Sequence, residues 1–113
     1  MKTIKLFFAG MIAFVLSNYA HAQNDTVRIK TSAICDQCKE RIENDLSFEK
    51  GIKSSNLDLN SKIITVIYSP KKTDSQKIRE AITRIGYDAD SLKADSKSYN
   101  KLPDCCKHPD KQH

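Results

Sequence analysis

The chain of 113 residues carries 19 basic and 14 acidic side chains, mixed along its length, for a formal net charge of +5 at pH 7. It contains no Trp and no cluster of Lys and Arg interleaved with aromatic residues, so we expect no nucleic-acid partner. A chain of this length forms one small domain with a thin core, which leaves little room for a buried catalytic cleft, and we do not expect an enzyme.

The first 22 residues have the layout of a secretory signal peptide. Lys2 and Lys5 precede the apolar run Leu6–Leu16, and the small-x-small pattern of Ala20 and Ala22 follows it. As a helix this run would rise only about 17 Å, short of the roughly 30 Å hydrocarbon core of a bilayer, which argues against a membrane anchor. We predict cleavage after Ala22 and an exported, soluble mature chain without a membrane span, located in the periplasm of a two-membrane bacterium.

The mature chain begins with a strand, a loop and a helix. Val27 and Ile29 alternate with charged neighbours, which predicts a half-buried strand. Further on, Cys38, Ile42 and Leu46 recur every four residues among charged side chains, which predicts an amphipathic helix. The loop between the two elements therefore leads into the N-terminus of a helix.

A β-hairpin is predicted next. Leu57 and Leu59 alternate with polar neighbours, and the turn signal "NSK" follows at 60–62. The β-branched, alternating segment "IITVIYS" at 63–69 predicts the returning strand.

A second helix, a weak strand and a tail complete the chain. The helix is expected to start at Thr73, its apolar residues in "IREAITRI" (78–85) share one face, and Gly86 ends it. The segment "YDADSLKA" (87–94) suggests a fourth strand. Residues 95–113 show no periodic pattern, and we expect a flexible tail that contains Cys and His.

This order of elements predicts the ferredoxin-like βαββαβ arrangement of the α+β class, with a four-stranded antiparallel sheet and two helices on one face. The predicted domain covers residues 23–94. Its expected core consists of Ile29, Ile42, Leu46, Leu59, Ile64, Val66, Ile78, Ile82 and Ile85.

Two cysteines, Cys35 and Cys38, lie where the first loop meets the helix. Thiolate is the metal-binding form of Cys, and a helix N-terminus favours it at Cys38. Two soft ligands suit Cu(I) or Hg(II), whereas Zn(II) prefers four ligands. An exposed two-ligand site also leaves room for the thiols of a partner to attack, so the pair could bind an ion and hand it over.

Two other interpretations of the pair stay open. An exported protein meets an oxidising environment, which permits a static disulfide. The alternative function is that of a thiol-disulfide redox protein, because Cys-x-x-Cys at the start of a helix is also the redox motif of thioredoxin-like proteins. Here Asp36 and Gln37 stand between the cysteines, no Trp precedes them, and the chain lacks the parallel crossover unit of that fold.

The segments "ICDQCKERIENDL", "KGI", "IITVIYSP" and "IREAITRIGYDA" resemble the heavy-metal-associated domain, the family of small copper chaperones, metal-pump N-terminal modules and periplasmic mercury-binding proteins. The resemblance covers about Thr26 to Leu92. It implies that Cys35 and Cys38 are the metal thiolates and that Tyr87 is the aromatic residue that packs near the metal loop. It also implies a monomer that exchanges one soft ion with a metal-transporting membrane protein.

The loop departs from the family pattern at two positions. Ile34 stands where the family usually has the Met that packs beneath the loop, and Ser32 replaces a Gly. We expect Ile34 to take the packing role, and we expect metal affinity and preference to differ from those of the family.

The tail carries a second group of soft or borderline ligands, Cys105, Cys106 and His108. They could fold back onto Cys35 and Cys38, form a separate site, or be an adventitious pair that oxidises. The crowding of Cys and His in a short tract favours an additional metal role.

Overall fold

The computed structural model describes residues 23–107, so the predicted signal peptide and His108 lie outside the described residues. In chain order the elements are β1 (Asp25–Lys30), α2 (Asp36–Leu46), β2 (Ile52–Asp58), β3 (Ile63–Tyr68), α3 (Ser75–Ile85), α4 (Ser96–Asn100) and the 3₁₀ helix η2 (Asp104–Cys106). Through α3 this is the predicted order, and the α+β class is confirmed. Within residues 23–107, no helix has the length and apolar character that a bilayer span requires.

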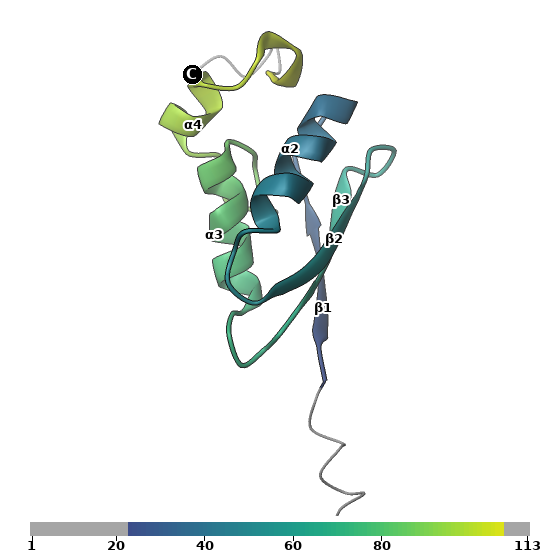
Figure 1. The fold of residues 1–113 in the computed structure, drawn as a ribbon. Helices are drawn as coiled ribbons and strands as arrows, with labels where there is room; N and C mark the ends of the chain where they lie inside the picture. Colours follow the sequence, from purple (N-terminus) through teal and green to yellow (C-terminus); the bar gives the residue numbers. More distant parts are fainter. Residues whose placement is uncertain (1–22, 108–113) are drawn as a thin grey trace, which may run out of the picture.

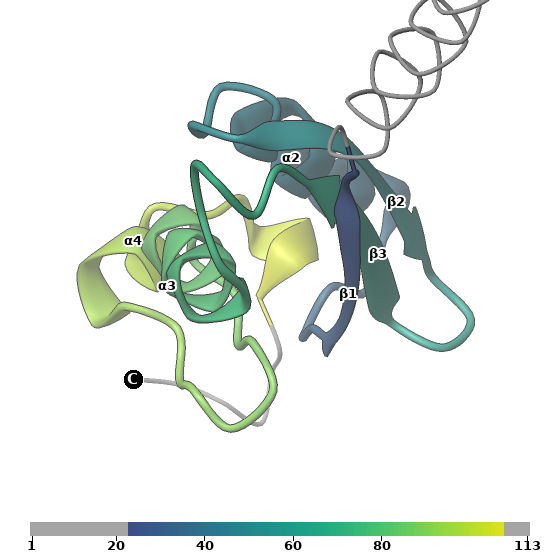
Figure 2. The ribbon, with the colours of Figure 1, turned by 90° about the horizontal axis from the view of Figure 1, so that it is seen from below.

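β3 is the central strand of an antiparallel sheet with the order β1-β3-β2. Val27 of β1 pairs with Val66, and Leu57 of β2 pairs with Ile64. Helices α2 and α3 lie on one face of this sheet, as Figures 1 and 2 show from two directions. Every second side chain of β3 is buried, as expected for a sheet with one covered face.

The prediction of a fourth strand over residues 87–94 was wrong, because among the described residues the sheet has three strands. The segment instead makes isolated bridges, one of which joins Ala89 to Thr31. Asp90 explains the interruption, since its φ of 53° is left-handed and turns the chain back. The backbone N–H and a carboxylate oxygen of Asp90 then bond to the C=O and N–H of Lys30, at 2.8 and 2.9 Å, which closes the edge of β1 at this residue.

The predicted core is buried except for Leu59 and Ile85, which are half-buried. Helix α3 starts two residues later than predicted, because Asp74 is its N-cap and accepts a hydrogen bond from the Lys77 N–H at 2.8 Å. Gly86 ends α3 as predicted, with a φ of 121°.

The chain beyond the predicted domain differs from the flexible tail that we expected, because residues 96–106 contain α4 and η2. Residues 23–107 therefore contain three α-helices rather than the two predicted. Tyr99, Leu102 and Cys106 have their side chains in the core, with exposed fractions of 5%, 5% and 1%. In Figure 1 this yellow-green segment passes over the ends of α3 and α2. It packs closely on Gly86, where a Cβ atom would lie 3.1 Å from Leu102 Cγ.

A candidate metal centre at the start of α2

The loop that leads into α2 is fixed on both sides. Thr31 is buried, its N–H and hydroxyl both donate to the Lys62 C=O, and its hydroxyl also accepts from the Ala33 N–H at 3.3 Å. Ser32, the residue that replaces the family's Gly, accepts a hydrogen bond from the Asp88 N–H at 2.9 Å. These hydrogen bonds hold the loop against the β2–β3 turn and against the segment after α3. A glycine at position 32 could not accept the bond from the Asp88 N–H, because it has no side chain.

Cys35 and Cys38 meet at the N-terminus of α2. Cys35 is the N-cap residue, and its C=O accepts the first helical hydrogen bond from the Lys39 N–H at 3.1 Å. Cys38 lies within the first turn, so its side chain points back toward the cap. The two Sγ atoms are 3.1 Å apart, with Cys38 buried and Cys35 half-buried.

The C-terminal segment brings two more thiols to the same place. Cys106 Sγ lies 3.6 Å from Cys35 Sγ, although the two residues are 71 apart in the sequence. Cys105 Sγ lies 3.9 Å from Cys106 Sγ, is exposed, and donates to the side-chain oxygen of Gln37 at 3.0 Å. The Sγ atoms of Cys35, Cys105 and Cys106 all lie within 4.8 Å of one another. All four cysteines, which are free thiols in the structure, therefore form one cluster, called the thiol cluster below.

Tyr87 lies beneath the thiol cluster, where the resemblance places an aromatic residue. Its ring is 1% exposed, and its hydroxyl group faces the thiols of Cys38 and Cys106. Among the described residues this buried hydroxyl has no hydrogen bond of good geometry. Burial raises the pKa of Tyr87, so the hydroxyl keeps its proton and remains a donor.

Burial and hydrogen bonding distinguish the thiols. Burial, together with the hydrogen bond to Cys38, raises the pKa of Cys106 to about 12 and also raises the pKa of Cys35. Burial acts in the same direction on Cys38, but hydrogen bonds from Cys106 and from the loop backbone at Ile34 oppose it, and the pKa of Cys38 is lowered. Cys38 is therefore the first of these three thiols to lose its proton.

Ile34 does not have the expected packing role. Its side chain is 38% exposed, and the fully buried residue of the loop is its neighbour Ala33. The strand alternation that buries Ile29 and Thr31 continues to Ala33, which directs the next side chain outward.

The sequence interpretation missed the residues that place the C-terminal thiols. Tyr99, Leu102 and Cys106 follow one another at i, i+3 and i+7, which is the spacing of a helix face. Gln37, taken only as a spacer between the cysteines, holds Cys105. The helical spacing of Tyr99, Leu102 and Cys106 could have been found in the sequence, although Pro103 interrupts the segment.

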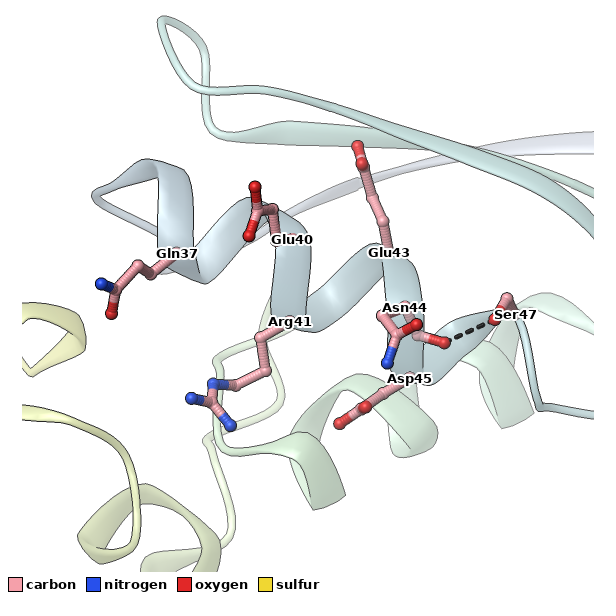
Figure 3. A pocket seen from close by; sticks show the side chains of 7 residues that line it. All are labelled: Gln37, Glu40, Arg41, Glu43, Asn44, Asp45 and Ser47. Atoms are coloured by element: carbon pink, nitrogen blue, oxygen red, sulfur yellow. Dashed lines mark hydrogen bonds between the residues drawn. The ribbon is translucent and has the colours of Figure 1, made fainter.

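A hollow of about 880 Å³ lies along the polar face of α2, lined by Gln37, Glu40, Arg41, Glu43, Asn44, Asp45 and Ser47. Figure 3 shows these side chains pointing out from the helix, and Gln37 toward the C-terminal segment. The hollow is a wide, open depression beside one helix, and the residues that line it are polar or charged, so it differs from an enclosed apolar ligand pocket.

Comparison with known proteins points to one family. Residues 32–88, half of the chain, match the heavy-metal-associated domain. The copper-exporting P-type ATPase of Staphylococcus aureus (strain JH9) is 34% identical over 67 residues, which are 59% of this chain but only 8% of that protein. The chain thus spans less than a tenth of the length of the curated relatives that it matches.

Solved structures extend the likeness to the fold. The water-soluble region of the P-type ATPase CopA from Bacillus subtilis is 29% identical, with a TM-score of 0.56 over 59% of this chain and 45% of that one. The CopZ metallochaperone (24% identity, TM-score 0.55) is matched over 57% of this chain and 98% of its own. Oxidized MerP from Ralstonia metallidurans CH34 (20% identity, TM-score 0.56) is matched over 59% and 94%. At these lower identities the last two show a shared fold.

Proposed function

Because the chain belongs to the heavy-metal-associated domain family, we propose that it binds one soft metal ion, Cu(I) in first place and Hg(II) as the second choice, through Cys35 and Cys38. It then sequesters the ion or passes it to a metal-transporting membrane protein. The protein acts as an exported, periplasmic monomer and is not an enzyme. The predicted signal peptide supports the export, and the fold match to CopZ and MerP supports the kind of site.

The observation that carries this proposal is the meeting of two Sγ atoms, 3.1 Å apart, at a helix N-terminus. Thiolates are soft ligands that select soft ions. The partial positive charge of the helix N-terminus stabilises negative sulfur. One thiol of the pair, Cys35, is half-buried rather than enclosed, so the sulfur of a partner can reach an ion held there.

We expect the reduced protein to hold one Cu(I) per chain against a competing chelator. A variant with Cys105→Ser and Cys106→Ser should keep strong preference for Cu(I) over Zn(II), because Zn(II) requires four ligands and the Cys35–Cys38 pair supplies two. Competition titration with chelators for each ion measures both affinities. Zn(II) binding as tight as Cu(I) binding by this variant would mean that a harder ligand, such as Asp36, completes the site.

The redox alternative predicts the opposite behaviour of Cys35. A thioredoxin-type motif attacks its substrate with a thiol of lowered pKa, whereas here the pKa of the more exposed thiol, Cys35, is raised by burial and by the hydrogen bond to Cys38. We expect the metal-free, reduced protein to show negligible reduction of insulin disulfides. The turbidity assay with a small dithiol as the control checks this, and turnover above that control would assign the protein to the redox class.

A further inference from the structure

The thiol cluster contains more sulfur than the proposed function uses. Cys106 belongs to a segment outside the matched family region, yet its Sγ is only 3.6 Å from Cys35 Sγ. Its position is set by packing, since Tyr99 and Leu102 anchor the same segment in the core. An adventitious pair on a loose tail would have no such anchors.

The spacing of the sulfurs fits a shared ion. Two thiolates that each lie about 2.3 Å from one three-coordinate, planar ion are about 4.0 Å apart. The observed Sγ–Sγ distances are 3.1 Å for Cys35–Cys38, 3.6 Å for Cys35–Cys106 and 3.9 Å for Cys105–Cys106. The Sγ atoms of Cys35, Cys105 and Cys106 lie within 4.8 Å of one another, so shifts of less than an ångström bring these three around an ion. Shifts of the same size suffice for the Cys35–Cys38 and Cys35–Cys106 pairs.

The Tyr87 hydroxyl gives an independent indication of a ligand. It is a buried donor without a well-formed hydrogen bond among residues 23–107, and it faces Cys38 and Cys106. A buried unsatisfied donor is costly. A thiol is a weak acceptor, but the thiolate that forms when an ion binds is a charged one, and hydrogen bonds to charged groups are the stronger kind. The Tyr87 hydroxyl therefore gains a charged hydrogen-bond acceptor when Cys38 or Cys106 binds a metal ion as a thiolate.

We infer that Cys106 is a third ligand, so that the ion rests in an inner site formed by Cys35, Cys38 and Cys106, and that Cys105 serves an outer site formed with Cys35 and Cys106. The inference rests on the proposed function, because both sites include Cys35. The inner site lies against Tyr87, and the outer site ends at the exposed Cys105. The ligand class is a soft, three-coordinate ion such as Cu(I).

The two sites share Cys35 and Cys106, which permits transfer one bond at a time. An ion enters on Cys105, Cys106 and Cys35, and each thiol that binds it releases its proton to water. The Cys38 thiol then loses its proton and its sulfur forms a bond to the ion, while the bond to Cys105 breaks and Cys105 takes up a proton. No electrons are transferred, and the ion keeps at least two sulfur ligands throughout.

X-ray absorption of the Cu(I)-loaded protein tests the third ligand. We expect three sulfur neighbours in the unaltered protein and in Cys105→Ser, and two in Cys106→Ser. Because residue 106 is buried, Cys106→Ala is the second variant, since it keeps an apolar side chain there and should also give two. Circular dichroism confirms that each variant is folded.

The matched neighbour Cys105→Ser tests the outer site. It should keep three sulfurs but release Cu(I) to a chelator more slowly than the unaltered protein. Equal rates would overturn the role of Cys105. One ion with two sulfurs in the unaltered protein would overturn the third ligand and leave the proposed function standing, whereas no Cu(I) binding at all would overturn the proposed function itself.

Discussion

Replacing Cys35 and Cys38 together by serine should weaken Cu(I) binding by more than about 100-fold. Loss of a residue that only hydrogen-bonds to a metal ligand already costs about 10–100-fold, and these two cysteines are the proposed ligands themselves. Serine offers a hard hydroxyl in place of a soft thiolate, so the ion loses the donors that select it. The fold should remain, since Ile42 and Leu46 still bury α2 against the sheet and serine at position 38 is close to Cys in size. Chelator competition measures the affinity, and circular dichroism measures the fold.

The double variant Cys105→Ser and Cys106→Ser is the matched control for this experiment. It removes the same number of thiols from the same cluster but spares the pair at the helix N-terminus, so it should retain tight binding with a smaller loss. Unfolding of the Cys35→Ser and Cys38→Ser protein would indicate that this pair is a structural crosslink, which contradicts the proposed shuttle.

Gly86→Ala should lower the free energy of unfolding by about 1–3 kcal/mol, the usual cost of a strained backbone conformation. The φ of 121° at Gly86 is one that L side chains rarely adopt, and the new Cβ would lie 3.1 Å from Leu102 Cγ and from the Ser98 C=O. Relief of that contact moves the C-terminal segment away from the end of α3, and Cys106 with it. We therefore expect fewer sulfur neighbours around bound Cu(I) as well as lower stability in urea.

Gly51→Ala separates these two effects. Gly51 also has a positive φ, 86°, and its new Cβ would lie 2.9 Å from Lys72 Cβ. It follows the C-terminal end of α2, whereas the thiol cluster lies at the N-terminal end, so the loss of stability should be similar while the sulfur count stays unchanged. A reduced sulfur count in both variants would attribute the effect to general loosening of the fold.

The sequence predicted the elements in which a local pattern repeats. In β1 and β3, alternate residues are apolar because alternate side chains of a strand point to the same sheet face. In α2, the buried face is marked by an apolar residue at every fourth position: Cys38, Ile42 and Leu46. The prediction of a fourth strand was wrong because one residue, Asp90, has a left-handed backbone conformation. This conformation interrupts the strand pairing that the neighbouring residues suggested. Such a conformation has no periodic signal.

The candidate site divides in the same way. Cys35 and Cys38 are three residues apart, so the helix start alone brings their sulfurs together. The approach of Cys106 depends on where α4 crosses the end of α3, which long-range packing against Gly86 decides. From the sequence, contact between the C-terminal cysteines and the Cys35–Cys38 pair was one of several possible arrangements. Only the folded structure shows that this contact is made.

The absence of a regular fourth strand within residues 23–107 also affects how two copies of the chain can meet. An unpaired sheet edge invites a strand from another molecule. At Leu57, side chains of α2 occupy the edge of β2, since Glu43 accepts from its N–H at 2.7 Å and Lys39 donates to its C=O at 2.9 Å. Asp90 does the same for Lys30 of β1. Both edges are thus blocked by side chains at the end of the sheet nearest the thiol cluster.

Farther along β1, no described strand pairs with the edge that faces away from β3. Every second residue there, like Lys30, directs its N–H and C=O groups away from β3. Arg28 and Lys30 are both exposed on this strand. Two copies that approached edge to edge in antiparallel fashion would bring these cations together, and like charges opposite each other destabilise a strand pair. Protection against assembly into larger sheets therefore depends here on charge, so raising the salt concentration should weaken it.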